Sequence, residues 1–281
     1  MAQVLLITQQ KFFVFNSLKG YIMRHSLLLA GILGTFATPA VVMAEESGTE
    51  TSPHSVTYNI GVTSQYIFRG LTQTAHEPAL QGGVDYAHAS GFYLGTWGSN
   101  VSWVNDGGYK EDNSMEWDVY GGYTNTFGDS GISYDVGLLQ YFYPGKTISG
   151  VQRPDTTEIY GALSWGPVTL KNSYVISNGA FGIKDGRGSN YLDLALDLPI
   201  GETGYAILAH VGYQYFDGKT AGASNDKAFS YTDWKLGMTR SWDNGVVAGG
   251  YYTGSDTDDA WKIDGKNIGK DTVTIFVQKT F

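Results

Sequence analysis

Apolar and polar residues alternate with a period of two along most of this chain. In one stretch, Ile132, Tyr134, Val136 and Leu138 share one parity, and Asp135 lies on the other. This period is typical of a β-strand with one apolar and one polar face. About twelve such segments can be delimited, at 55–70, 78–89, 91–104, 114–127, 131–143, 155–165, 167–177, 190–199, 203–217, 231–242, 245–253 and 272–281.

Short and long connections strictly alternate between these segments. Short turns fall at 89–91, 128–131, 165–167, 201–204 and 243–245, and long polar loops at about 71–77, 105–113, 144–154, 178–189, 218–230 and 254–271. Transmembrane β-barrels sort their connections in this way, with short periplasmic turns and longer outer loops. We therefore predict an all-β fold: a single antiparallel transmembrane barrel of about 12 strands over residues 55–281, with both termini periplasmic.

The last strand and the composition agree with a lipid environment. Val273, Ile275 and Val277 alternate down to a terminal aromatic residue, Phe281, which we expect to be the assembly signal; Lys279 departs from the apolar pattern. Charged residues make up 16% of the chain, against about 25% in ordinary domains. The chain has 20 Tyr and 7 Trp, which suit interfacial belts, and no Cys, which excludes disulfide and thiolate chemistry.

The N-terminal 44 residues have the pattern of a secretory signal. Basic residues including Arg24 precede a leucine-rich run at 27–33, and small residues lead to a predicted cleavage site after Ala44. Met23 would begin a signal of ordinary length, so the true start is predicted there. Residues 45–54 read as a polar linker before the barrel.

Because arginine or lysine on the lipid face at mid-membrane costs roughly 2–4 kcal/mol, charged residues of the strands are expected to face the lumen. The candidate pore-lining residues are Arg69, Gln81, Asp85, Glu116, Asp118, Asp135, Glu158, Lys171, Asp193, Asp197, His210, Asp233 and Lys235. Acids outnumber bases in this set, which favours cations in a pore. The alternative is that the charges pair and fill a closed barrel. Arg69 is expected to end the first strand, where it would either bind anions or pair with Asp85 or Glu77; a structural pair with an acid is favoured.

The motifs near the start of the barrel resemble a known family. They are Ser-Gln-Tyr-Ile-Phe-Arg-Gly at 64–70, Pro-Ala-Leu-Gln-Gly-Gly-Val-Asp-Tyr at 78–86, Gly-Phe-Tyr-Leu-Gly-Thr-Trp-Gly-Ser-Asn-Val at 91–101, and Glu-Trp-Asp at 116–118 with Tyr-Gly-Gly-Tyr at 120–123. This run resembles the TorF-type porin family of proteobacterial outer membranes. The resemblance implies an outer-membrane barrel acting as a porin, and it supplies no catalytic residues.

The function expected is passive diffusion of small polar solutes or ions, with a bias toward cations. A non-conducting structural or interaction barrel is the first alternative. An outer-membrane hydrolase is the second, although neither His88 nor His210 has an evident serine and acid arrangement. No catalytic residue, metal or cofactor is predicted.

The expected partners follow from this location. They are outer-membrane lipid and lipopolysaccharide, the barrel-assembly machinery with periplasmic chaperones, and the small solutes or cations themselves. The net charge of −9 argues against nucleic acid.

Overall fold

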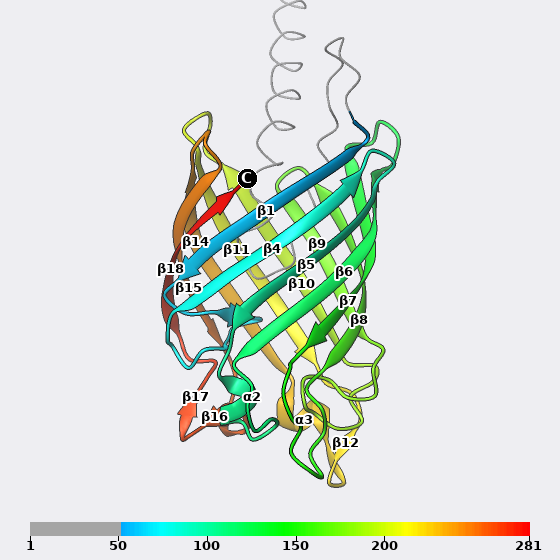
Figure 1. The fold of residues 1–281 in the computed structure, drawn as a ribbon, viewed down its shortest axis with the longest axis vertical. Coiled ribbons are helices and arrows are strands. Elements are labelled where there is room, and N and C mark those ends of the chain that lie inside the picture. The colour runs from blue at the N-terminus through cyan, green and yellow to red at the C-terminus, as the bar shows by residue number, and fades with distance from the viewer. Residues whose placement is uncertain (1–51) are drawn as a thin grey trace, which may run out of the picture.

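The computed structural model describes residues 52–281, and its main feature is one closed antiparallel barrel of twelve strands (Figure 1). The strands follow one another around the wall in chain order, and β1 closes the barrel against β18. They are β1 His54–Thr63, β4 Ala79–His88, β5 Phe92–Asn100, β6 Met115–Thr126, β7 Ile132–Phe142, β8 Thr156–Trp165, β9 Val168–Val175, β10 Asn190–Pro199, β11 Tyr205–Tyr215, β14 Tyr231–Ser241, β15 Val246–Ser255 and β18 Thr272–Thr280. The predicted fold class is confirmed.

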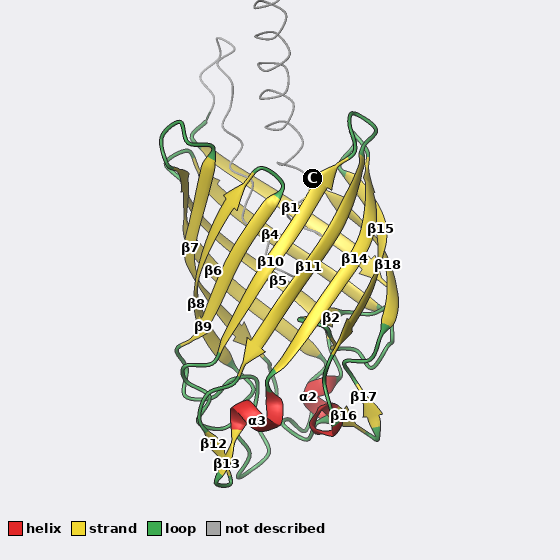
Figure 2. Ribbon diagram, turned by 180° about the vertical axis from the view of Figure 1, so that it is seen from behind, coloured by secondary structure: helices red, strands yellow, loops and turns green. Residues whose placement is uncertain are grey.

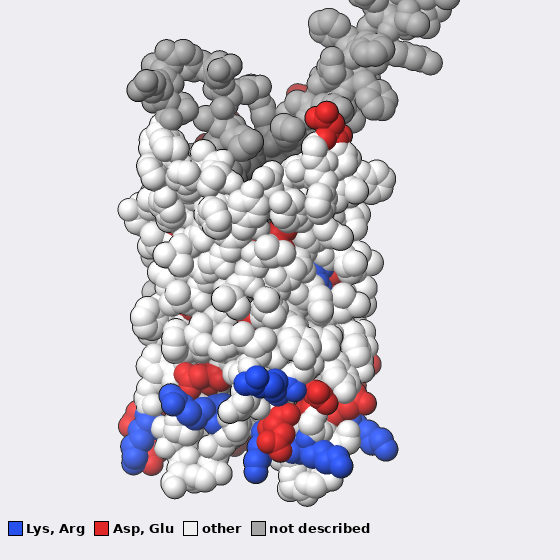
Figure 3. Space-filling view, turned by 90° about the vertical axis from the view of Figure 1, so that its right-hand side faces the viewer, with Lys and Arg blue, Asp and Glu red and all other residues white. Residues whose placement is uncertain are grey.

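The strand parity places the apolar side chains on the outer surface of the barrel. On β10, Leu192 and Leu194 are 47% and 48% exposed, whereas Asp193 between them is 4% exposed. No second layer of structure covers this surface in the described part of the chain (Figure 2). In the view of Figure 3, the Lys, Arg, Asp and Glu side chains gather mainly at one end, below an almost uncharged band. An apolar band of this kind is stable when it faces lipid.

The two ends of the barrel differ sharply. Five short turns lie at one end, together with the start of β1 and the end of β18, and six longer connections lie at the other (Figure 1). At the short-turn end Gly91 has φ +103°, and a Cβ there would lie 2.3 Å from the Thr124 carbonyl oxygen. Turn glycines of this kind are therefore required by the backbone.

The long loops carry small elements of their own. The connection after β1 contains β2 Ile67–Phe68 and β3 Leu71–Thr72, and the one after β5 contains α2 Trp103–Asp106. The connection after β11 contains β12 Lys219–Thr220, β13 Ala223–Ser224 and α3 Asn225–Phe229; the last contains η1 Asp259–Trp261, β16 Lys262–Ile263 and β17 Lys266–Asn267. Among residues 52–281 there is no helix long and apolar enough to cross a membrane.

The prediction for the first strand was wrong at its C-terminal end. The expected strand 55–70 stops at Thr63, and the chain then turns inward. Buried residues of both kinds follow, such as Gln65, Tyr66 and Ile67. The β2–β3 hairpin continues a short-range alternation, so the period alone could not separate it from the wall. The predicted signal, its cleavage after Ala44 and the linker up to residue 51 lie outside the described residues, and His54 belongs to β1.

Candidate functional site in the barrel lumen

The lumen receives all of the predicted pore-lining side chains. Twelve of them alternate with the outward apolar residues along the wall strands, and they lie on the inner face: Gln81, Asp85, Glu116, Asp118, Asp135, Glu158, Lys171, Asp193, Asp197, His210, Asp233 and Lys235. Arg69 reaches the lumen by a different route, on the inward hairpin.

The inward hairpin is formed by residues 64–74. Its turn has positive φ at two central residues, Arg69 (+46°) and Gly70 (+76°), the pattern of a type I′ turn that matches strand twist. The Tyr231 hydroxyl donates to the Arg69 carbonyl oxygen at 2.9 Å. A Cβ at Gly70 would lie 2.5 Å from Cβ of Asp233, so the turn is pressed against β14. The tip of the hairpin therefore reaches across the lumen to the wall strand β14.

Arg69 is enclosed by groups from several parts of the barrel. Its guanidinium donates to Glu158 Oε2 and to Gln214 Oε1, both at 2.8 Å. Its Cζ lies 4.7 Å from the ring centre of Phe68, 5.6 Å from that of Phe181 and 4.5 Å from that of Tyr191. We call these five partners the Arg69 cage. The side chain is 5% exposed, and the guanidinium stays charged.

The predicted partners of Arg69 were therefore wrong. Asp85 instead accepts a hydrogen bond from the Tyr120 hydroxyl at 2.5 Å, and Glu77 is exposed. The reason is the inward turn after Thr63. It moves Arg69 from the end of a wall strand, beside β4, to the opposite side of the lumen, where β8 and β11 lie.

A group of buried carboxylates lies next to the cage. Glu116 accepts hydrogen bonds from Tyr66 at 2.7 Å and from Tyr143 at 2.6 Å. Burial first, and the Glu116 carboxylate second, raises the pKa of each of these tyrosines well above its usual range. Both oxygens of Asp118 and Oε1 of Glu158 are buried without a hydrogen-bond partner. Such orphaned oxygens are costly and call for a functional explanation.

A second group is centred on His210. Its Nδ1 lies 3.0 Å from Asp193 Oδ1 and its Nε2 lies 3.1 Å from Asp233 Oδ1, so a carboxylate faces each ring nitrogen. Tyr191 donates to the other oxygen of Asp233 at 2.9 Å. His210 is thus held by two acids rather than paired with a serine. An acid at each ring nitrogen fixes the ring and leaves neither nitrogen free to act as the base for a serine nucleophile.

The two lumenal lysines lie against aromatic rings. Lys171 Nζ is 4.2 Å from the ring centre of Tyr160, and Lys235 Nζ is 4.8 Å from that of Tyr251. The predicted lumenal residues include three bases, these two lysines and Arg69, against eight acids. The interior described here is therefore acidic even if His210 carries a charge.

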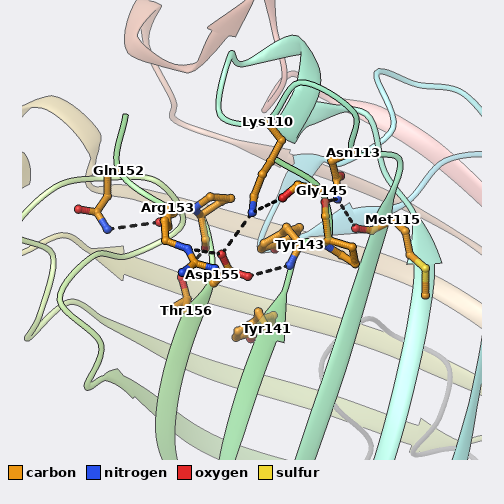
Figure 4. A network of polar contacts seen from close by, with 12 residues as sticks. Lys110, Asn113, Met115, Tyr141, Tyr143, Gly145, Gln152, Arg153, Asp155 and Thr156 are labelled. Carbon is orange, nitrogen blue, oxygen red and sulfur yellow. Dashed lines mark hydrogen bonds and ion pairs between the residues drawn. The ribbon is translucent and has the colours of Figure 1, made fainter. Parts of the chain in front are cut away.

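At the long-loop end a polar network joins two loops to the rim of the barrel (Figure 4). Lys110 is buried, with Nζ 3.6 Å from Asp155 Oδ2 and 3.3 Å from the Gly145 carbonyl oxygen. Asp155 Oδ1 also accepts from the Tyr143 backbone N–H at 3.1 Å. This network holds the loop before β6 against the loop before β8. It adjoins the Glu116 group, because the Tyr143 hydroxyl donates to Glu116.

The inner aromatic residues were missed in the sequence. The prediction assigned tyrosine to interfacial belts, but a set of tyrosines is buried inside: Tyr66, Tyr93, Tyr120, Tyr141, Tyr143, Tyr160, Tyr191, Tyr231 and Tyr251. Parity could have found many of these. Tyr120 and Tyr160 follow Asp118 and Glu158 by two residues, and Tyr191 precedes Asp193 by two, so each shares the inward face of its acid.

Among solved structures, several porins are similar to this barrel. The KdgM porin is 12% identical, with a TM-score of 0.49 over 80% of this chain and 98% of that one. The NanC porin is 11% identical, with a TM-score of 0.47 over the same shares. Pseudomonas aeruginosa OprD is 13% identical, with a TM-score of 0.39 over 83% of this chain and 68% of that one.

The search of curated proteins finds no match. One family model matches residues 47–281, which include the whole barrel. The chain therefore belongs to the family described as "Bacterial protein of unknown function (Gcw_chp)".

Proposed function

We propose that this protein is an outer-membrane porin for small polar solutes or ions. The observation that carries the proposal is the inverted polarity of the closed barrel, apolar outside and charged inside. A soluble barrel would have the opposite arrangement, whereas a membrane barrel requires this one. The TorF-type resemblance of the motifs between residues 64 and 123 leads to the same function.

We propose a bias toward cations as the second part of this function. Eight lumenal acids face Arg69 and two lysines, so the interior carries a negative potential that attracts cations and repels anions. Both termini are proposed to face the periplasm, because short turns lie on that side in bacterial barrels. Phe281, exposed at the end of β18, would be read by the assembly machinery, and the outer band would meet lipid and lipopolysaccharide.

The test is conductance of the full-length chain, expressed in a Gram-negative host and purified from its outer membrane. In a planar bilayer across a KCl gradient, we expect discrete ohmic steps and a reversal potential of the sign for potassium preference. Anion preference would refute the cation bias. A folded protein that never conducts, either with or without the hairpin residues 65–73, would refute the porin assignment.

A second function is favoured by one observation, the filling of the lumen near the long loops. The hairpin crosses the interior, and Glu116, Asp118 and Glu158 are each at most 2% exposed. A barrel closed in this way could instead serve as a structural or interaction protein that uses its outer loops. Absence of conductance from both the wild type and a variant without residues 65–73 would favour this function.

A further inference from the structure

The Arg69 cage has the composition of a receptor for an organic cation. It offers one carboxylate oxygen and one amide oxygen at 2.8 Å, and the rings of Phe68, Phe181 and Tyr191 around the guanidinium carbon. Aromatic rings with a carboxylate bind weakly hydrated cations such as guanidinium and alkylammonium groups. A hydrated inorganic ion gains less from rings and loses more water.

The carboxylates around the cage have more acceptor oxygens than Arg69 can satisfy. Glu158 uses Oε2 for Arg69 and leaves Oε1 without a hydrogen-bond partner, although the side chain is fully buried. Asp118 is paired in register with Tyr141, which itself donates to Glu158 at 3.2 Å, and neither oxygen of Asp118 has a partner. The charge of Lys171 also acts on Glu158, but this lysine donates no hydrogen bond to these three oxygens, so the site has acceptor oxygens that the guanidinium of the hairpin leaves unsatisfied.

The hairpin is anchored outside the cage, by the hydrogen bond of Tyr66 to Glu116 and by that of the Thr72 N–H to the Ile268 carbonyl oxygen, so a solute has to displace only the Arg69 side chain. The two strands of the hairpin have two residues each, and its tip places the non-glycine Arg69 at φ +46°, a strained backbone conformation. The chain thus uses a strained turn to insert its own cation into the cage. A tethered occupant of this kind can be replaced by a free solute of the same chemistry when that solute is abundant.

We propose that the Arg69 cage is a binding site for guanidinium and alkylammonium solutes, which Arg69 occupies when no solute is present. Guanidinium and alkylammonium compounds would then be the solutes of the proposed porin, and only their transport rests on that proposed function. The binding itself does not depend on conduction. Solutes with such a group would enter by displacing Arg69 from Glu158 and Gln214.

The experiment uses Arg69→Ala, which empties the cage, and methylguanidinium chloride as the probe. Binding is measured by titration calorimetry on the full-length chain in detergent micelles, with folding checked by heat-modifiable gel mobility. We expect Arg69→Ala to bind methylguanidinium about tenfold or more tightly than the wild type, because no side chain competes. Adding Glu158→Gln should abolish that gain.

Arg240→Ala is the matched control. Arg240 also stacks on two rings, with Cζ 4.6 Å from Tyr205 and 5.4 Å from Trp242, but it lies on the outer face with no carboxylate partner among the described contacts. It should behave as the wild type. If folded Arg69→Ala binds methylguanidinium no better than this control, the proposal is wrong.

Removal of one partner of a buried ion pair is destabilising, so Arg69→Ala could fail to fold unaided. In that case the Arg69→Ala variant is refolded in methylguanidinium chloride and, as a control, in KCl of the same ionic strength, and the yields of folded protein are compared. Recovery with methylguanidinium alone would support the site, and equal yields in the two salts would overturn it. Binding without conductance would remove the porin function and leave this site standing.

Discussion

Replacing Leu236 with arginine tests whether the outer face of the barrel lies in lipid. Leu236 is the sixth of eleven residues in β14 and is 61% exposed. Its distance from either strand end is five residues of about 3.4 Å, which a tilt of about 40° reduces to roughly 13 Å along the membrane normal. An apolar band about 25 Å tall therefore has its midplane near this residue.

At the midplane the substitution should cost about 2–4 kcal/mol of the free energy of unfolding, roughly a 30- to 900-fold change in the folding equilibrium. Thr232→Arg is the matched control on the same face of β14. It lies four residues nearer the long loops, about 10 Å toward the band edge, where arginine costs only about 0–1 kcal/mol. The native Arg240, stacked on Tyr205 and Trp242 at the opposite edge, follows the same rule.

The assay is reversible urea unfolding in lipid vesicles, followed by tryptophan fluorescence. The expected result is a large loss for Leu236→Arg and a small one for Thr232→Arg. If the two losses agree within about 0.5 kcal/mol, the range of ordinary surface substitutions, the outer face is not at mid-membrane depth and the reasoning fails.

The remaining predictions concern the hairpin, the loops and the buried tyrosines. Gly70→Ala should lower the free energy of unfolding by about 1–3 kcal/mol, because φ is +76° and the new Cβ would meet Asp233; an unchanged urea midpoint would contradict this. Lys146→Ala removes an ion pair whose lysine is 73% exposed, so the same titration should show a change below about 1 kcal/mol. Tyr66 and Tyr143 have pKa values raised by burial and by a shared carboxylate, so they stay protonated in the folded protein above pH 10, where the unfolded chain ionises. Their contribution to stability is complete below a pH of about 10 and is lost as the pH rises further. Near-ultraviolet titration of the double variant Tyr66→Phe/Tyr143→Phe should show two fewer late-ionising groups than the wild type.

The fold could be predicted because one rule decides most of it. A period of two assigns every strand residue to a face, and lipid outside fixes which face is apolar. The limits of the strand β10, 190–199, follow from this rule, as does the inward position of Asp193 and Asp197. The two faces of the segment 91–104 could not be assigned in this way, because Phe92 and Leu94 alternate with Tyr93 and Trp97. Both of its faces carry aromatic residues, because the lumen itself is lined with them: Tyr93 and Trp97 face inward and Phe92 outward.

The contacts inside the lumen could not be predicted by the same rule. Arg69 and Gln214 are 145 residues apart in the chain, and they meet only because a loop folds inward. Alternation fixes the face of a strand residue but says nothing about the path of a loop. The partners of Arg69 and the ring of Phe181, which comes from the loop after β9, therefore required the structure.

The charged interior is difficult to explain as a source of stability. Buried ion pairs are often matched or exceeded in stability by well-packed apolar residues of similar volume, and an orphaned carboxylate such as Asp118 is a net cost. The barrel has another source of stability, since its closed ladder satisfies the backbone and its outer band faces lipid. Selection for folding alone would then have filled the lumen with apolar side chains. Because acids instead outnumber bases there, and because a strained turn places a cation among them, the interior is better explained by the handling of charged solutes than by the needs of the fold.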